Sequence, residues 1–312
     1  MAHSPDATRP SPPNPLVAFL FTLRRDRHPL NRAWNTFFRS CPQTNYRVHV
    51  HSDPAFRAPS NRSQQQLATQ GAFAHALVPP PYVHIARFGY TMVQARMLLL
   101  RHAASAAGQP ADWFLFFSES DAPIRSCPDL LRYLSRRGGS SFAYADPPSP
   151  QQQQGGAAWA RHFARACPPC AAANISAVDY RHGPGWVALH RDQVLPLLER
   201  EAVHATVFNV TGVDGLGVPD EWYWTTLVQA QGGRRYNHLL TYMQPGDAKT
   251  GHSRMFGATD LPELISKAQA RQWPSFFVRK FPTNPQMDQA LATSLQSMRH
   301  SGKNGSMARK IA

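Results

Sequence analysis

Val17-Ala-Phe-Leu-Phe-Thr-Leu23 is a short, continuous apolar run, which fits a buried strand better than a helix. The stretch from Pro29 to Arg39 then places apolar residues at the spacing of an amphipathic helix. Tyr46-Arg-Val-His-Val-His51 alternates like a strand and runs into the turn Ser52-Asp53-Pro54. This β-α-β order predicts an α/β fold with a mostly parallel central sheet flanked by helices. Ligands are expected beyond the C-terminal ends of its strands.

Further along the chain, the pattern of strand and helix continues. Trp113-Phe-Leu-Phe-Phe117 is the most apolar strand candidate, and it ends in Ser118-Glu-Ser-Asp121. Other strands are expected at residues 185–189 and 276–281, and helices at 91–107, 127–137, 191–201 and 219–231. Asp220 and Glu221 lie at the N-terminus of the last of these helices, where the helix dipole favours negative charge.

Length and composition bound the organisation of the chain. Its 312 residues, 42% of them hydrophobic, are enough for one large domain or two closely joined ones. Residues 1–15 are polar and Pro-rich and read as a disordered leader. We assign residues 16–285 to the globular domain, with a low-complexity surface loop at about 147–158, and residues 286–312 to a tail that becomes disordered toward its end.

The charge balance points to an anionic partner. Lys and Arg number 33 against 19 Asp and Glu, a formal charge of +14, which suits nucleic acid, membrane headgroups or phosphorylated small molecules. The basic residues are scattered and no nucleic-acid module accompanies them, so nucleic-acid binding is not favoured. No apolar run reaches the roughly 18 residues of a membrane span, and the N-terminus lacks the apolar region of a signal peptide.

The cysteines and glycosylation sequons carry less information. Four cysteines, Cys41, Cys127, Cys167 and Cys170, permit two disulfides without requiring any. Cys167-Pro-Pro-Cys170 has redox-motif spacing but lacks the preceding strand of a thioredoxin-like unit, which favours a structural role. Four N-x-[ST] sequons, at Asn61, Asn174, Asn209 and Asn304, fit a luminal protein.

Glu221 is the candidate general base for transfer to a hydroxyl group. Inverting transfer of a sugar needs a carboxylate to remove the proton of the acceptor and positive charge on the departing diphosphate. The aromatic residues Trp222-Tyr-Trp224 follow Glu221 and are potential sugar platforms. The alternative is that Asp220 and Glu221 only begin a helix favourably, with the aromatic residues in the core.

Other candidates lie at predicted strand ends and loops. Arg254, Arg279 and Lys280 are candidates for the diphosphate. Glu119-x-Asp121 resembles the D-x-D arrangement that holds Mn²⁺ or Mg²⁺, or else Asp121 fixes the turn and Glu119 pairs with an arginine. Asp53 either accepts bonds from a nucleoside or caps the turn before Pro54.

Several segments resemble the core-2/I-branching β-1,6-N-acetylglucosaminyltransferases, in particular their plant and algal relatives. The similarity begins in Phe19-Leu-Phe-Thr-Leu23, Pro29-Leu-Asn-Arg-Ala-Trp34 and Val48-His-Val-His-Ser-Asp-Pro54. It continues through Gly89-Tyr-Thr-Met-Val-Gln-Ala-Arg96, Phe116-Phe-Ser-Glu-Ser-Asp-Ala-Pro-Ile124 and Gly185-Trp-Val-Ala-Leu-His-Arg191. Val218-Pro-Asp-Glu221 and Phe277-Val-Arg-Lys-Phe281 complete the series, in the family's order, over about residues 17–282.

The resemblance implies a GT-A-like fold and an inverting glycosyltransferase that uses a UDP-sugar and a glycan or glycoprotein acceptor, with Glu221 as base. It implies that cations, here Arg254 and Lys280, take the place of a metal, so no cofactor is expected, and Glu119 and Asp121 become substrate-binding or structural. The family also implies a membrane-anchored enzyme in the Golgi lumen, although this sequence shows no anchor. N-acetylglucosamine is the donor sugar that the resemblance suggests.

Further residues are expected to bind substrate, and a second hypothesis stays open. Asp53, Asp220 and Trp186 join Arg279 in the expected substrate-binding set, and Trp159, Trp186 and Tyr180 are candidates to line the acceptor site, each with a core alternative. The alternative function is a catalytically silent glycan-binding module of the same fold.

Overall fold

The computed structural model describes most of the globular region. It covers residues 14–24, 28–56, 71–86, 89–106, 109–147, 150–209, 218–246, 253–270 and 275–308, with the backbone alone at 150–155, 159, 268–270 and 299–308. Among these residues no helix is both long and apolar enough to cross a membrane.

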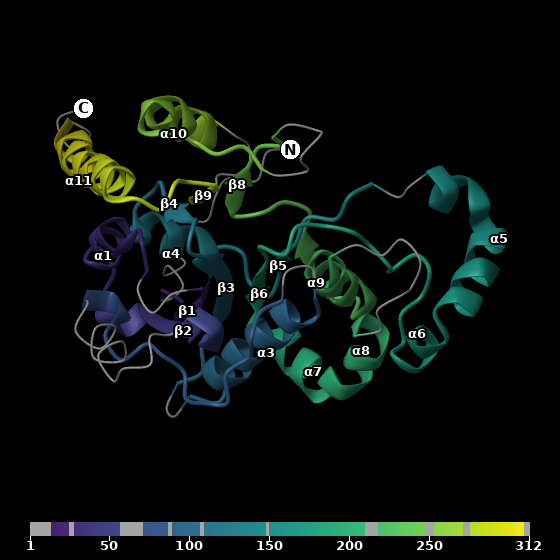
Figure 1. Ribbon diagram of the computed structural model, residues 1–312. Helices are drawn as coiled ribbons and strands as arrows, with labels where there is room; N and C mark the ends of the chain where they lie inside the picture. Colours follow the sequence, from purple (N-terminus) through teal and green to yellow (C-terminus); the bar gives the residue numbers. More distant parts are fainter. Residues whose placement is uncertain are drawn as a thin grey trace, which may run out of the picture.

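A six-stranded sheet in the order β2-β1-β3-β6-β5-β7 lies at the centre of the molecule (Figure 1). β1 (Val17–Leu23) runs parallel to both of its neighbours, β2 (Tyr46–Ser52) and β3 (Trp113–Ser118). The sheet continues with β6 (Ala188–His190), antiparallel to β3, and with the short strands β5 (Ser141–Phe142) and β7 (Arg235–Tyr236). The predicted α/β fold with a mostly parallel central sheet is confirmed.

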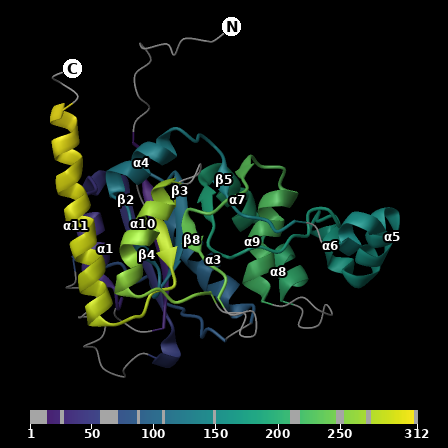
Figure 2. The same ribbon diagram turned by 90° about the horizontal axis from the view of Figure 1, so that it is seen from above.

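Helices cover both faces of this sheet. The helices of the described residues are α1 (Asn31–Phe38), α3 (Thr91–Ala104), α4 (Cys127–Ser135), α5 (Pro150–Ala166), α6 (Pro168–Ala172), α7 (Arg191–Glu199), α8 (Glu201–Phe208), α9 (Pro219–Ala230), α10 (Leu261–Ala270) and α11 (Pro285–Ala308). In both views α1 and α11 lie together at one end, while α5 and α6 extend away at the other (Figures 1 and 2).

The side chains of β1 belong to two hydrophobic cores, one on each face of the sheet. Phe19 and Phe21 point to the side covered by α1, where Phe19 packs edge-on against Phe38 with ring centroids 5.0 Å apart. Ala18 and Leu20 belong to the core on the side of α3. Both faces of the strand are therefore buried, which is why its sequence lacks the polar alternation of an exposed strand.

A second, three-stranded sheet in the order β4-β9-β8 lies beyond the end of β3. Its strands are β4 (Ala122–Pro123), β9 (Phe277–Arg279) and β8 (Thr241–Met243). β4 follows directly on Ser118-Glu-Ser-Asp121, so this sheet brings the C-terminal segment to the carboxyl ends of the parallel strands.

Two segments differ from the sequence prediction. Residues 285–308 form α11 where a tail disordered toward its end was expected. Met287, Leu291 and Leu295 form one buried stripe at i, i+4 and i+8, and the Asp288 carboxylate accepts from two backbone N–H groups at the start of α1. The expected loop at 147–158 is largely helical, since α5 begins at Pro150 and is interrupted at Gly156, whose φ of 38° is left-handed.

All four cysteines form disulfides, Cys41 with Cys127 and Cys167 with Cys170. The first pair links the segment after α1 to the start of α4, across 86 residues of sequence. The second links two cysteines that are separated by two prolines at the start of α6, and both cysteines are buried. The structural role predicted for Cys167 and Cys170 agrees with this burial.

Candidate active site

Asp121 lies at the centre of a polar network beyond the end of β3. Its side chain is fully buried, and its Oδ2 accepts hydrogen bonds from Ser118 Oγ at 2.8 Å and from Trp186 Nε1 at 3.0 Å. Its Oδ1 lies 3.8 Å from Nη1 of Arg279. Asp121 therefore fixes the turn after β3, as one of its two predicted roles required, and also joins Trp186 and Arg279.

Arg279 is held on three sides at the end of β9. Its Nη1 donates to Ser118 Oγ at 2.7 Å and Ser120 Oγ at 3.2 Å, and its guanidinium lies 3.8 Å from the ring centroid of Trp186. Burial lowers the pKa of Arg279, and the neighbouring Asp121 carboxylate opposes that shift. The cation is thus pre-positioned before any ligand binds.

Trp186 is in turn shared with a second arginine, Arg96 of α3, whose guanidinium lies 5.5 Å from the ring centroid. Arg96 is almost completely buried and donates to Asp220 Oδ2 at 3.1 Å and to the Gly185 carbonyl at 3.0 Å. A Cβ atom on Gly185 would lie 2.4 Å from Arg96 Nη1, so only glycine allows this approach. The pair fixes the segment before β6 against the start of α9.

Asp220 therefore has a structural role here. Burial raises its pKa, and the Arg96 guanidinium acts in the opposite direction. Removing either partner of such a buried pair leaves an uncompensated charge, a change that typically costs about 3–5 kcal/mol. Its neighbour Glu221 is consequently anchored from one side.

Glu221 is partly exposed, with 37% of its side chain accessible, and its Oε2 lies 3.1 Å from His182 Nε2. His182 Nδ1 contacts Asp146 Oδ2 at 2.5 Å, so an imidazole lies between two carboxylates. The Glu221 hydrogen bond, together with Asp146 and against the effect of burial, raises the pKa of His182 to about 9. Within the part of the chain that the structure describes, only the Oε2 atom of Glu221 has a side-chain hydrogen bond.

The aromatic residues after Glu221 divide between the site and the core. Tyr223 and Trp224 are fully buried, while Trp222 is partly exposed and lies edge-on to His182 with centroids 5.3 Å apart. Tyr180 is buried and stacks on Trp222 at 4.8 Å, so its core alternative applies. The side chain of Trp159 lies outside the described residues.

Arg254 and Lys280 lie on adjacent backbone segments. Phe256 N–H donates to the Lys280 carbonyl at 2.8 Å, and Lys280 N–H to the Arg254 carbonyl at 3.4 Å. Arg254 is 45% exposed, and its guanidinium donates to Asp260 Oδ1 at 2.9 Å and lies over the Phe256 ring. The fold therefore brings the backbones of these two residues, 26 positions apart in sequence, side by side, and Lys280 directly follows Arg279.

Asp53 is enclosed by neighbouring backbone groups and by His84. Its side chain is fully buried, with Oδ1 accepting from Ala55 N–H at 2.9 Å and contacting His84 Nδ1 at 3.0 Å, and Oδ2 accepting from Ile85 N–H at 3.0 Å. In this structure the carboxylate has no exposed surface, so nucleoside binding stays a prediction. The turn-capping alternative agrees with the structure, and through it Asp53 holds the segment at His84, whose side chain is 62% exposed.

Glu119 and Asp121 do not form a divalent-metal pair in this arrangement. Glu119 Oε2 accepts from the backbone N–H of Arg24 at 3.3 Å. Asp121 is buried and faces the guanidinium of Arg279, a positive charge in the place that a cation bound to Asp121 would need. The donor set is poorly suited to Mn²⁺ or Mg²⁺, which prefer several accessible oxygen ligands.

A profile of the family described as Core-2/I-Branching enzyme matches residues 17–269. The chain belongs to this family. That match contains Asp121, Trp186, Asp220, Glu221 and Arg254, and the predicted resemblance is confirmed. Arg279 and Lys280 lie just beyond its end.

Among curated proteins, the core-2/I-branching chain is similar to glycosyltransferase BC10 of Oryza sativa subsp. japonica, with 27% identity over 195 residues. The alignment covers 62% of this chain and 43% of the rice protein, so the chain spans less than half of that relative.

Two solved glycosyltransferases show weak likeness in fold. The galactosyltransferase LgtC, in complex with donor and acceptor sugar analogues, gives a TM-score of 0.41 at 12% identity and covers 89% of this chain and 96% of its own. Mouse xyloside xylosyltransferase 1, in its apo form, gives 0.38 at 12% identity and covers 85% and 96%. At these values the likenesses support no inference about donor or mechanism.

Three residues of the site in this core-2/I-branching member were missed as site residues from sequence. Arg96 lies in a segment that resembles the family, but its partner Asp220 is 124 positions away. His182 and Asp146 carried no motif. The sequence His182-Gly-Pro-Gly-Trp186 could have drawn attention to this segment because it holds two closely spaced glycines. In the structure, a Cβ atom on Gly183 would lie 2.0 Å from the Tyr144 carbonyl oxygen, so the backbone is closely packed there.

Proposed function

We propose that this chain is an inverting glycosyltransferase that moves a sugar from a UDP-sugar to a hydroxyl group of a glycan or glycoprotein. One observation carries the proposal. The accessible carboxylate of Glu221 adjoins Asp220, which pairs with Arg96. Trp186 contacts both Arg96 and Arg279, so a series of contacts connects Glu221 to Arg279 and the neighbouring Lys280. The proposed base and the proposed diphosphate-binding cations are therefore held by one connected set of buried side chains.

Glu221 acts as the general base. Inversion requires the acceptor oxygen to attack the anomeric carbon from the face opposite the departing UDP while its proton moves to a carboxylate oxygen. The 3.1 Å contact with His182 fixes Oε2 of Glu221, and Oε1 takes the proton. Asp146 orients the imidazole from its other nitrogen, so His182 and Asp146 are positioning residues for the base.

Positive side chains stabilise the leaving diphosphate. Arg254 and Lys280 supply the charge that a metal supplies elsewhere, and Arg279 adds to the positive field while holding Asp121 and Trp186. We therefore propose that transfer needs no metal ion. The network around Asp121 and Trp186 then shapes the donor pocket, with Glu119 at its edge.

Family membership supports the finer assignments. N-acetylglucosamine is the donor sugar that we propose, the Golgi lumen is the proposed location, and membrane attachment is proposed by analogy with the family. The BC10 relative is named a glycosyltransferase, which agrees with the reaction class. A catalytically silent glycan-binding module remains the competing function, and it predicts binding without turnover.

UDP release from a panel of UDP-sugars, with and without EDTA, tests the proposal. One donor, UDP-N-acetylglucosamine, should support release in the presence of an acceptor glycan, and EDTA should leave the rate unchanged. Loss of activity on chelation would contradict the metal-free reaction and would favour metal binding by Glu119 and Asp121. UDP binding without release for every donor and acceptor would favour the silent module.

The pair of Glu221 and His182 predicts a pH-dependent contribution to stability. The pKa of His182 is about 9 in the folded protein and about 6.5 in an unfolded chain, so the folded state binds the proton more tightly. The contribution is fully present below pH 6.5 and is lost as the pH rises through 9. The His182 side chain is 39% exposed, so solvent screening limits its contribution to stability to a few degrees in Tm.

Thermal unfolding of the wild type and His182→Gln at pH 6 and pH 9.5 measures this contribution. The substitution should lower Tm at pH 6, and the gap should narrow at pH 9.5. Asp146→Asn should reproduce part of the effect because it removes one of the two carboxylates. A gap of equal size at both pH values would show that His182 is not held protonated by Glu221 and Asp146.

A further inference from the structure

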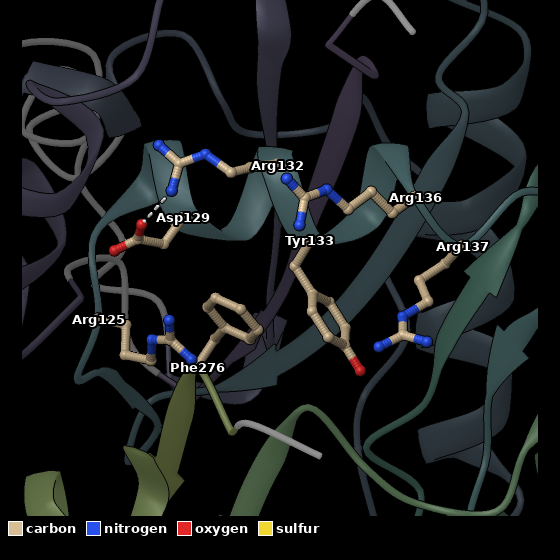
Figure 3. Close-up of a pocket in the computed structure, with 7 residues that line it drawn as sticks. All are labelled: Arg125, Asp129, Arg132, Tyr133, Arg136, Arg137 and Phe276. Atoms are coloured by element: carbon tan, nitrogen blue, oxygen red, sulfur yellow. Dashed lines mark hydrogen bonds and ion pairs between the residues drawn. The ribbon is translucent and has the colours of Figure 1, made fainter. Parts of the chain in front are cut away.

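A cavity of about 230 Å³ lies beside α4, and none of its lining residues belongs to the network around Glu221 and Asp121. Its lining contains four guanidinium groups and one carboxylate, together with two aromatic rings (Figure 3). They are Arg125, Arg132, Arg136, Arg137, Asp129, Tyr133 and Phe276. With three more positive than negative side chains around one cavity, an anion is the ligand that the site suits best.

Aromatic rings hold two of the arginines in place. The Arg125 guanidinium lies 4.5 Å from the ring centroid of Phe276, and the Arg137 guanidinium lies 4.5 Å from that of Tyr133. The two rings pack together with centroids 5.2 Å apart, and Figure 3 shows them between these two arginines. Stacking fixes the plane of each guanidinium, so the direction of its N–H groups is set before a ligand binds.

The single carboxylate is already in use. Asp129 Oδ1 accepts from Arg132 at 2.9 Å, and its Oδ2 accepts from the Ser126 hydroxyl at 2.6 Å at the start of α4. Arg125 is partly buried, and burial lowers its pKa; the Asp129 carboxylate opposes this shift, and Arg132 adds a smaller repulsive contribution. Bringing these cations together costs free energy, and an oxyanion bound among them would offset that cost.

We propose that these residues form a second glycan site, which binds a carboxylate or sulfate ester carried by a sugar of an acidic polysaccharide. The choice of a glycan as the carrier rests on the proposed function. The cavity is smaller than the roughly 300–1,000 Å³ of a typical ligand pocket, so it takes one anionic sugar unit of a longer chain. A compact cavity, rather than a long basic stripe, favours this ligand over nucleic acid.

The site and the proposed transfer centre share β9 and its flanking residues. Phe276 immediately precedes β9 and lines the cavity, while Arg279 ends β9 and contacts Trp186. Three residues of extended chain span about 10 Å. An acidic polysaccharide held at the cavity therefore lies within a few sugar units of the transfer site.

Fluorescence anisotropy with labelled oligosaccharides tests the site without any donor sugar present. The probes are a heparin hexasaccharide, which carries sulfates and carboxylates, an oligogalacturonate, which carries carboxylates alone, and a neutral xylo-oligosaccharide. The wild type should bind one or both acidic probes and not the neutral one. The two acidic probes together show whether sulfate or carboxylate is the preferred anion.

A double substitution on the exposed face of α4 identifies the residues. R132Q/R136Q should weaken binding of the acidic probe by at least about tenfold, since each lost hydrogen bond between charged groups is worth about that factor. The matched control is R161Q/R165Q, which removes two charges at the same spacing from exposed positions of α5. R132K/R136K keeps the charge and loses the fork geometry, so its loss should be intermediate.

Three results would overturn the second site. These are equal loss in the control pair, equal binding of the neutral probe, and tighter binding of a single-stranded DNA oligonucleotide that is weakened by R132Q/R136Q to the same extent. Equal loss in the control pair would indicate binding by the overall positive charge of the protein, and tighter DNA binding would indicate a nucleic-acid surface. UDP release by R132Q/R136Q with a neutral acceptor should match the wild type, so failure of this site and failure of the proposed reaction give different results.

Discussion

Replacing Glu221 by glutamine should lower kcat about 10²- to 10⁴-fold, the usual contribution of a general base. Glutamine has nearly the same shape and retains an oxygen that accepts from His182 Nε2, 3.1 Å away from the carboxylate in the wild type. The Asp220 ion pair with Arg96 is untouched, so the start of α9 stays in place. The loss then reports the missing base and not a displaced helix.

The measurement is UDP release at saturating donor and acceptor, together with the affinity for UDP. Glu221→Gln should bind UDP within about twofold of the wild type because the diphosphate cations are unchanged. Glu199→Gln makes the same chemical change at an exposed position near the end of α7 and is the matched control. Retention of most of the activity in Glu221→Gln would exclude this carboxylate as the base, and loss in Glu119→Gln instead would transfer the role to Glu119.

The long strands of the central sheet were predictable from their sequences, whereas β5 and β7, with two residues each, were not predicted. β1 and β3 are buried on both faces, so each is a continuous apolar run, and a run of this length leaves little choice of structure. Glu221 and Arg279 were found through short segments that resemble a family. The second sheet, whose strands are two or three residues long, had too little sequence per strand to be recognised as a sheet.

The partners within the site were not predictable from spacing. Arg96 and Asp220 are brought together by the packing of α3 against α9, and no local pattern records that contact. The same applies to His182, which gains its role from Asp146 and Glu221 on two other segments. For Asp53 the sequence left two roles open, and its bonds to Ala55 N–H, Ile85 N–H and His84 favour the turn-capping one.

The C-terminal helix was missed for a compositional reason. Ser, Gly, Lys and Asn dominate the end of the chain and suggested a tail disordered toward its end, and the helical spacing of Met287, Leu291 and Leu295 at the start of this tail was missed. Tertiary packing on α1, with Asp288 accepting from the Ala33 N–H at 2.9 Å, stabilises what local propensity alone does not.

Replacing Lys280 by alanine should lower kcat about 10²- to 10³-fold, the usual loss when one group that stabilises a leaving or developing charge is removed. The Lys280 backbone contacts both Arg254 and Phe256, and these contacts survive the substitution because they use main-chain atoms. Negative charge grows on UDP only as the bond to the sugar breaks. The loss should therefore appear in kcat more than in the KM for the donor.

The metal-free assignment makes Lys280→Ala a sharp test. Added Mn²⁺ should rescue little of its activity, because Asp121 faces Arg279 and offers a cation no open site. Arg254→Ala should give a similar loss, and the double variant should lose less than the product of the two, since both cations act on one diphosphate. The control is Lys267→Ala, which removes an exposed lysine paired with Glu263 on α10. Full activity in Lys280→Ala, or its restoration by Mn²⁺, would assign the diphosphate to a metal and remove Lys280 from the reaction.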